Sequence, residues 1–133
     1  MARDMKITFP GGKRVDAFYK GFHIKTDQPI YLGGEGSFAA PFDLFLVSIG
    51  TCSGIYVLSF CQNRNIPTED LTLTMRTEKN RETKRIERIS IDIELPAEFP
   101  EKYKNAIIKS VNGCSVKVHM EYAPVFEVRA HIP

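Results

Sequence analysis

The chain has 133 residues, of which 43% are hydrophobic and 26% charged, a composition typical of one globular domain covering residues 1–133. Lys and Arg number 18 against 16 Asp and Glu, so the net charge is +2, and Trp is absent. This balance, without a basic stripe, argues against a nucleic-acid-binding protein. The 3 cysteines are an odd number without close spacing, which argues against a secreted disulfide scaffold. The first residues are charged and no apolar run follows them, so we expect no signal peptide and predict a cytoplasmic protein with reduced thiols.

Alternating apolar residues predict three short strands at the start of the chain. The alternation covers residues 5–9, 15–19 and 22–26. Turn-forming residues at 10–12 and 20–21 separate these strands. The pattern is typical of an antiparallel meander.

A glycine-rich connection and a long apolar helix follow the meander. Three glycines lie within residues 28–40, which favours a flexible connection. Pro41 suits the first turn of a helix, which we predict to run to about Asn65. Residues 44–61 carry no charge and raise the alternative of a membrane span. The small, weakly polar residues 50–54 and the lack of flanking Trp or charge asymmetry favour a buried central helix, so no membrane partner is expected.

The next region predicts a hairpin and a second helix. Apolar residues alternate over residues 71–76 and again over residues 89–95. Apolar positions then recur every four residues from 99 to 111, and Asn112 and Gly113 end this helix in the manner of a glycine cap.

The last region is ambiguous at its beginning. Residues 114–122 fit a strand and fit a short helix equally well, and periodicity does not decide over so few residues. Phe126, Val128 and Ala130 alternate as a final strand. The resulting order, βββ-α-ββ-α-β, predicts an α+β fold with a mostly antiparallel sheet.

Two cysteines lie in settings that suit chemistry. Cys52 sits inside the most apolar stretch of the chain, and Cys114 directly follows the helix break at Gly113. If the two thiols meet across a core, they can carry out thiol–disulfide exchange. The alternative is that each is a small buried hydrophobic residue. Cys61 lies nine positions after Cys52, on nearly the opposite face of the helix, and we predict that it is a core residue.

The sequence PFDLFLVSIGTC at residues 41–52, followed at a distance by GCSV at residues 113–116, resembles the OsmC/Ohr family. This family contains the osmotically inducible protein C and the organic hydroperoxide resistance proteins. The resemblance implies sheets wrapped around central helices in an intertwined homodimer. It also implies reduction of organic hydroperoxides in oxidative stress defence, with Cys52 attacking, Cys114 resolving, and a lipoyl-type or other small dithiol as reductant.

The resemblance also implies a cation beside the attacking thiol. The family places an Arg in the turn after the first strand, where Lys13 matches by position and Arg14 by chemistry. A free thiol titrates at about 8.5, so a nearby guanidinium would favour the Cys52 thiolate. Asp43 or Glu35 would orient that cation. The alternatives are that the basic turn is an ordinary surface turn and that Asp43 complements the helix dipole.

Apolar side chains of the long helix are candidates for a substrate pocket. Phe42, Phe45, Ile49 and Tyr56 would favour a hydrophobic peroxide over hydrogen peroxide. The best-studied family members carry a Glu where this chain has Phe42. This departure motivates a second hypothesis, a protein on the same scaffold that binds an apolar or thiol-bearing small molecule without turnover. A third and weaker hypothesis is a purely structural dimer, with both thiols as packing residues.

Neither metals nor cofactors are expected from the residue spacing. The chain has 3 cysteines and 3 histidines, but they form no Cys-x-x-Cys or His-x-x-x-His pattern. The glycine-rich connection lacks the Lys-Ser/Thr ending of a phosphate-binding loop. The predicted reaction therefore relies on the side chains of the protein alone.

Overall fold

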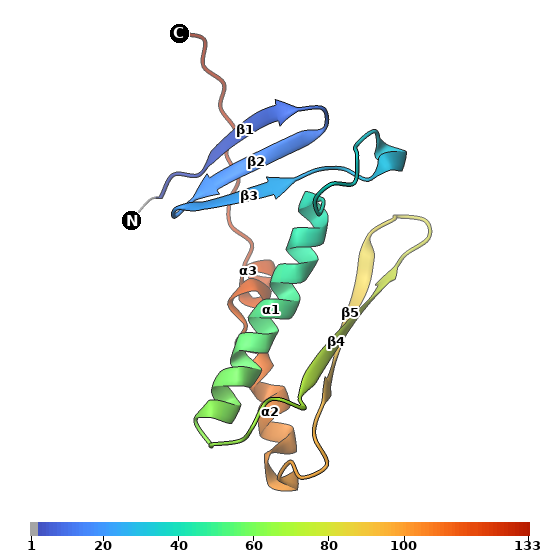
Figure 1. The fold of residues 1–133 in the computed structure, drawn as a ribbon, viewed down its shortest axis with the longest axis vertical. Helices are drawn as coiled ribbons and strands as arrows, with labels where there is room; N and C mark the ends of the chain where they lie inside the picture. Colours follow the sequence, from blue (N-terminus) through green and yellow to red (C-terminus); the bar gives the residue numbers. More distant parts are fainter. Residues whose placement is uncertain (1–2) are drawn as a thin grey trace. The chain divides into compact units, whose positions relative to one another are not determined.

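The computed structural model describes residues 3–133 and divides into two compact units, Met1–Val47 and Ser48–Pro133. The first unit contains three strands and a 3-10 turn: β1 (Lys6–Gly11), β2 (Arg14–Tyr19), β3 (Phe22–Thr26) and η1 (Ile30–Leu32). Helix α1 (Pro41–Gln62) begins in the first unit and continues into the second. The second unit also contains β4 (Thr72–Lys79), β5 (Ile86–Glu94), η2 (Glu101–Tyr103), α2 (Lys104–Val111) and α3 (Ser115–Glu121) (Figure 1).

The predicted antiparallel meander is confirmed in the first unit. Strand β2 lies between β1 and β3, and both pairings are antiparallel (Figure 1). The β1–β2 turn contains Gly12, whose φ is 57°. Residues other than glycine rarely adopt this left-handed conformation. The meander places Asp16 opposite Lys25 and Phe18 opposite His23 on the neighbouring strand.

The glycine-rich connection was predicted to be flexible, and the structure corrects this expectation. The carboxylate of Asp27, which is 1% exposed, accepts hydrogen bonds from the backbone N–H groups of Gln28, Glu35 and Ser37 and from the Ser37 hydroxyl. These hydrogen bonds stabilise the ionised carboxylate and hold the pKa of Asp27 at about 2, and the bond from the Ser37 side chain contributes most. A Cβ on Gly34 would overlap the backbone carbonyl of Gln28, so the fold needs glycine there.

Helix α1 ends at Gln62 rather than at about Asn65. Asn65 has a φ of 55°, outside helical geometry, and the N–H of Ile66 donates back to the carbonyl of Cys61. Pro67 follows and cannot continue a helix. By length and composition α1 could cross a membrane, a property that the core helices of soluble proteins share.

The core of the second unit lies where α1, α2 and the β4–β5 hairpin meet. Val57, Phe60 and Cys61 of α1 pack with Ile107 of α2 into one buried cluster. Side chains of the hairpin and of the flanking loops cover it, among them Leu71, Leu73, Ile93, Leu95 and Phe99. The predicted hairpin and second helix are therefore both confirmed, with η2 forming the first turn before α2.

The C-terminal region resolves one ambiguity and overturns one expectation. Residues 115–121 form helix α3 and not a strand. The expected final strand at Phe126, Val128 and Ala130 is wrong for this structure, because residues 123–133 form neither helix nor strand. An alternating sequence becomes a strand only against a hydrogen-bonding neighbour, and here Val128 is 96% exposed. The observed order of the described helices and strands is thus βββ-α-ββ-α-α, still an α+β fold with antiparallel strands.

Candidate active site

The structure brings the thiols of Cys52 and Cys114 together within the second unit. Cys52 lies on α1 and is half-buried, whereas Cys114 immediately precedes α3 and is 1% exposed. The two side chains form a hydrogen bond, and both residues are free thiols. Two sulfurs from distant parts of the sequence therefore lie within reach of one another.

The surroundings of Cys52 favour its ionised form. The thiol of Cys114 makes the largest contribution by hydrogen bonding, followed by the backbone N–H of Val116, and these lower the pKa of Cys52. Partial burial opposes ionisation, and the backbone N–H of Ser115 adds to the stabilisation. The thiolate is the nucleophilic form of cysteine, so this arrangement favours the nucleophilic form of Cys52.

Local folding places Cys114 at this position. Its backbone N–H donates to the carbonyl of Val111 at the end of α2, and its carbonyl accepts the N–H of Val118 in α3. Cys114 therefore ends one helical segment and begins the next. Tyr56 lies one turn after Cys52 on α1 and packs beside Gly113. A Cβ added to Gly113 would lie 3.6 Å from the Cε1 atom of Tyr56.

Cys61 has the opposite surroundings, and the prediction that it is a core residue is confirmed. It is 0% exposed and belongs to the buried cluster around Ile107. Burial raises the pKa of its thiol, and the nearby positive charge of Arg64 offsets part of this effect. A buried, protonated thiol of this kind is inert.

The two predicted cations lie in the first unit. Arg14 Nη2 donates to Asp16 Oδ1 at 2.7 Å, and its guanidinium carbon lies 4.7 Å from the centre of the Phe38 ring. The Lys13 side chain lies beside Gly33 of the glycine-rich connection, and a Cβ added to Gly33 would lie 3.4 Å from the Cε atom of Lys13. Their action on Cys52 stays a prediction.

The acidic partner of Arg14 differs from the two that were expected. Asp43 Oδ2 accepts the backbone N–H of Ala40, as a residue in the first turn of a helix does. The backbone N–H of Glu35 donates to Asp27. Asp16 pairs with Arg14 instead, and sequence reasoning missed it because acidic residues in a half-buried strand are expected to face solvent.

The four predicted pocket residues have different environments. Phe42 and Phe45 are 53% and 40% exposed, and their ring centres lie 5.5 Å apart. In the second unit, Ile49 is buried and lines a cavity of about 290 Å³. The other residues around this cavity are Ser53, Ile89, Ile91, Val111, Asn112, Lys117 and Met120. That all four line one substrate pocket stays a prediction.

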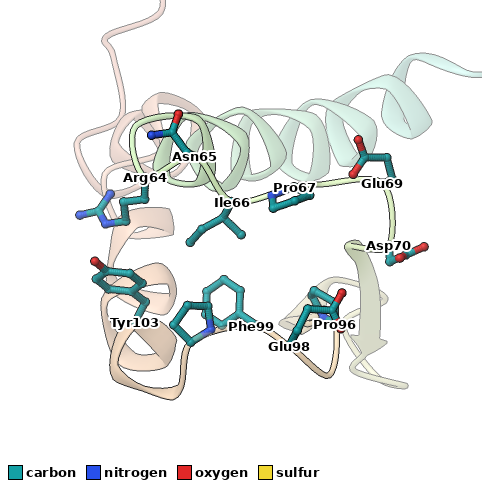
Figure 2. A pocket seen from close by; sticks show the side chains of 11 residues that line it. Arg64, Asn65, Ile66, Pro67, Glu69, Asp70, Pro96, Glu98, Phe99 and Tyr103 are labelled. Carbon is teal, nitrogen blue, oxygen red and sulfur yellow. The ribbon is translucent and has the colours of Figure 1, made fainter.

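A separate hollow of about 270 Å³ lies between the loop after α1 and the loop before α2 (Figure 2). Ile66 and Phe99 face one another across it, and charged side chains such as Arg64, Glu69 and Glu98 stand at its edge (Figure 2). Neither Cys52 nor Cys114 is among its lining residues, so it is distinct from the thiol pair. Within residues 3–133, no group of three His, Cys, Asp or Glu side chains is placed to hold a metal ion.

Comparison with known proteins identifies the family. The OsmC-like protein family matches residues 34–129 of the chain, whereas no curated protein matches its sequence. A proposed osmotic stress induced and detoxification response protein from Psychrobacter arcticus 273-4 is 22% identical, with a TM-score of 0.72 over 89% of this chain and 87% of that one. An OsmC-like protein from Mycoplasma pneumoniae is 13% identical, with a TM-score of 0.70 over 92% of this chain and 89% of that one. The organic hydroperoxide resistance protein OsmC from Legionella pneumophila is 16% identical, with a TM-score of 0.58 over 90% of this chain and 89% of that one. Identities this low bear on the fold alone, but the family match covers most of the sequence, and the chain belongs to the OsmC-like protein family.

Proposed function

We propose that the protein is a thiol-dependent peroxidase that reduces organic hydroperoxides to alcohols. Membership of the OsmC-like family supports a general redox or stress-response role. The observation that carries the finer assignment is the hydrogen bond between Cys52 and Cys114, which lowers the pKa of the more exposed thiol. A nucleophilic thiolate beside a second thiol is the minimum that a two-cysteine peroxidase needs.

The reaction follows from this pair. The Cys52 thiolate attacks the distal oxygen of the hydroperoxide, the O–O bond breaks, and the alkoxide leaves and takes up a proton to become the alcohol. Cys52 is then a sulfenic acid. The Cys114 thiol attacks its sulfur, the S–O bond breaks, water leaves, and a disulfide remains. A small dithiol, lipoyl-type or other, reduces this disulfide by two thiol exchanges and is itself oxidised to a disulfide.

The remaining parts of the proposal concern the cation and the assembly. Arg14, with Lys13 as the second candidate, stabilises the Cys52 thiolate and the charge on the departing oxygen. The protein acts as a cytoplasmic homodimer. Exposed large apolar side chains such as Phe9 and Phe126, which are 79% and 84% exposed, support contact with a second copy.

A stoichiometric reaction with cumene hydroperoxide tests this function. Reduced protein should consume one peroxide per protomer and form a Cys52–Cys114 disulfide, identified by peptide mapping. Cys52→Ser should consume none. Cys114→Ser should still react once, but Cys52 should then proceed to sulfinic acid with excess peroxide, because no thiol traps the sulfenic acid.

Cys61→Ala is the matched control, because Cys61 lies on the same helix and is not part of the pair. Its peroxide consumption should equal that of the wild type. Retention of all thiols after treatment would reject the peroxidase. Unreactive thiols together with a copurified apolar or thiol-bearing molecule would instead support the binding protein considered from the sequence.

A further inference from the structure

The hollow between the loop after α1 and the loop before α2 has an apolar floor. It holds about 270 Å³, and all its lining residues belong to the second unit. Ile66 and Phe99 face one another across it, and both also pack against the buried core cluster (Figure 2). Three prolines, whose rings stiffen the backbone, line it as well: Pro67, Pro96 and Pro100. A preformed apolar hollow of this size suits a small ligand.

A guanidinium is held in place at one end of the hollow. Arg64 Nη1 donates to the carbonyl of Phe60 at 3.1 Å, and the guanidinium carbon lies 3.6 Å from the centre of the Phe60 ring and 5.3 Å from that of Tyr103. Lys102 Nζ lies 5.0 Å from the centre of the same Tyr103 ring and adds a second positive charge. Within residues 3–133 the guanidinium forms no ion pair with a carboxylate. Because arginine has five N–H donors and the bond to Phe60 uses one, this end is prepared to bind a carboxylate of a ligand.

Three carboxylates lie toward the other end of the hollow. In Figure 2 they stand away from Arg64, and they are Glu69, Asp70 and Glu98. All three are exposed, and none forms an ion pair within the part of the chain that the structure describes. Their combined negative potential favours an ammonium group. The two ends of the hollow therefore favour opposite charges, with apolar surface between them.

We propose that this hollow binds short apolar peptides of two or three residues with free termini. The terminal carboxylate of the peptide pairs with Arg64, its apolar side chains lie against Ile66 and Phe99, and its ammonium group faces the three carboxylates. Each residue of an extended chain adds about 3.5 Å between the terminal charges, whereas a single amino acid carries both charges on one carbon. The inference goes beyond the proposed function, because neither Cys52 nor Cys114 lines the hollow.

The test is the binding of leucyl-leucine to the full chain, followed by the amide NMR signals of the protein. We expect a Kd of about 0.1–1 mM, the range that a ligand with so few atoms reaches in an open site. The signals that shift should be those of residues around the hollow, such as Asn65, Glu69 and Phe99. Glycyl-glycine carries the same charges without apolar side chains, and it should bind at least about tenfold more weakly.

Capped peptides and charge-removing variants pair each terminal charge with its partner. N-acetyl-leucyl-leucine lacks the ammonium group and leucyl-leucinamide lacks the carboxylate, so each should bind about fivefold more weakly than leucyl-leucine. Arg64→Gln should weaken leucyl-leucine by about the same factor but should not weaken leucyl-leucinamide, which has no carboxylate to lose. The triple variant Glu69→Gln, Asp70→Asn, Glu98→Gln should weaken leucyl-leucine but not its acetylated form.

Glu127→Gln and Arg129→Gln are the matched controls, because they remove one charge of each sign from an exposed ion pair outside the hollow. Each should leave the affinity unchanged. Cys52→Ser should bind as the wild type does, so the outcome is independent of whether the protein consumes peroxide. If Arg64→Gln does not fold, as judged by circular dichroism, Arg64→Lys takes its place. It keeps the charge but loses the paired donors of the guanidinium, so it should weaken leucyl-leucine and not its amide.

Several outcomes would overturn the proposal. These are no binding at about 10 mM leucyl-leucine, equal affinities of the free and capped peptides, or signal shifts confined to residues away from the hollow. Tighter binding of leucyl-leucinamide than of leucyl-leucine would assign the hollow to cations alone and would also reject it. Equal weakening of leucyl-leucine and its amide by Arg64→Gln would show that Arg64 only supports the fold of the hollow.

Discussion

Cys52 and Cys61 lie nine residues apart on one helix, yet their surroundings shift their pKa values in opposite directions. At Cys52, a second thiol and two backbone N–H groups stabilise negative charge. At Cys61, the apolar cluster around Ile107 excludes water and disfavours charge. The comparison teaches that the reactivity of a thiol in this protein is set by the donors that reach it, because the residue type and the helix are the same.

The largest expected effect is the difference in reactivity between the two thiols. With iodoacetamide at pH 7.5, Cys52 should be alkylated at least about a thousandfold faster than Cys61, since the latter is inaccessible and protonated. Peptide mass spectrometry over time measures both rates in one sample.

The pH dependence sharpens the same comparison. Because the pKa of Cys52 is lowered and that of Cys61 is raised, thiolate absorbance at 240 nm should rise first from Cys52 as the pH increases. Cys52→Ser should lose this early rise, and Cys61→Ala should keep it. An early rise that survives in Cys52→Ser would contradict the assignment.

The second largest effect comes from opening the cluster around Cys61. Ile107 is 0% exposed, and Ile107→Ala should lower the free energy of unfolding by about 2–5 kcal/mol through the cavity it leaves. The protection of Cys61 from alkylation should fall with it. Urea denaturation gives the first quantity and the alkylation rate the second.

Ile108→Ala is the control for this substitution. Ile108 neighbours Ile107 in sequence but is 51% exposed, so its truncation should change the free energy of unfolding by less than about 1 kcal/mol. Equal losses in the two variants would show that the cluster does not depend on Ile107.

A smaller effect is expected when Cys52 loses its neighbouring thiol. Cys114→Ala removes the hydrogen bond that contributes most to lowering the pKa of Cys52, so that pKa should rise. One unit of pKa corresponds to about tenfold less thiolate at pH 7, and alkylation should slow by up to that factor. An unchanged rate would assign the activation of Cys52 to the backbone N–H groups alone.

The smallest effect concerns the cation near Cys61. The guanidinium of Arg64 lies 3.6 Å from the centre of the Phe60 ring, and Arg64→Gln should lower the free energy of unfolding by about 0.5–1 kcal/mol. The pKa of Cys61 should rise further, because the positive charge that partly offsets burial is gone. Thermal unfolding compared with Arg129→Gln, an exposed change outside every helix and strand, measures the difference.

Local patterns in the sequence predicted most of the fold. The meander, the apolar helix, the hairpin and α2 each follow from hydrophobic periodicity and turn residues, which act over a few neighbours. The choice between strand and helix at residues 114–122 and the fate of residues 123–133 depend on which surfaces lie beside them. Periodicity holds no information on those neighbours, so an ambiguity remained at the first segment and an error arose at the second.

The candidate site was also predictable only in part, because local sequence patterns reveal some of its residues and contacts between distant residues determine the others. Cys52 and Cys114 stood out by their settings, and the structure places them together. Asp16 escaped notice because its burial depends on Arg14 from the same strand and His23 from the next, a contact made only when the strands pair. Asp27 escaped notice because the donors to its carboxylate are backbone N–H groups and the Ser37 hydroxyl, which lie up to ten residues away in the sequence.

The loop gathered around Asp27 has a consequence for the tolerance of this protein to acid. Its folded pKa of about 2 lies below the ordinary 3.8, so the loop gains stability from ionisation at any pH above 3.8 and loses it as the pH falls toward 2. Mild acidification therefore leaves the connection in place. Substitutions at residues of this loop other than Gly34 and Ser37 leave the hydrogen bonds to Asp27 in place, whereas an insertion would move the N–H donors away from the carboxylate.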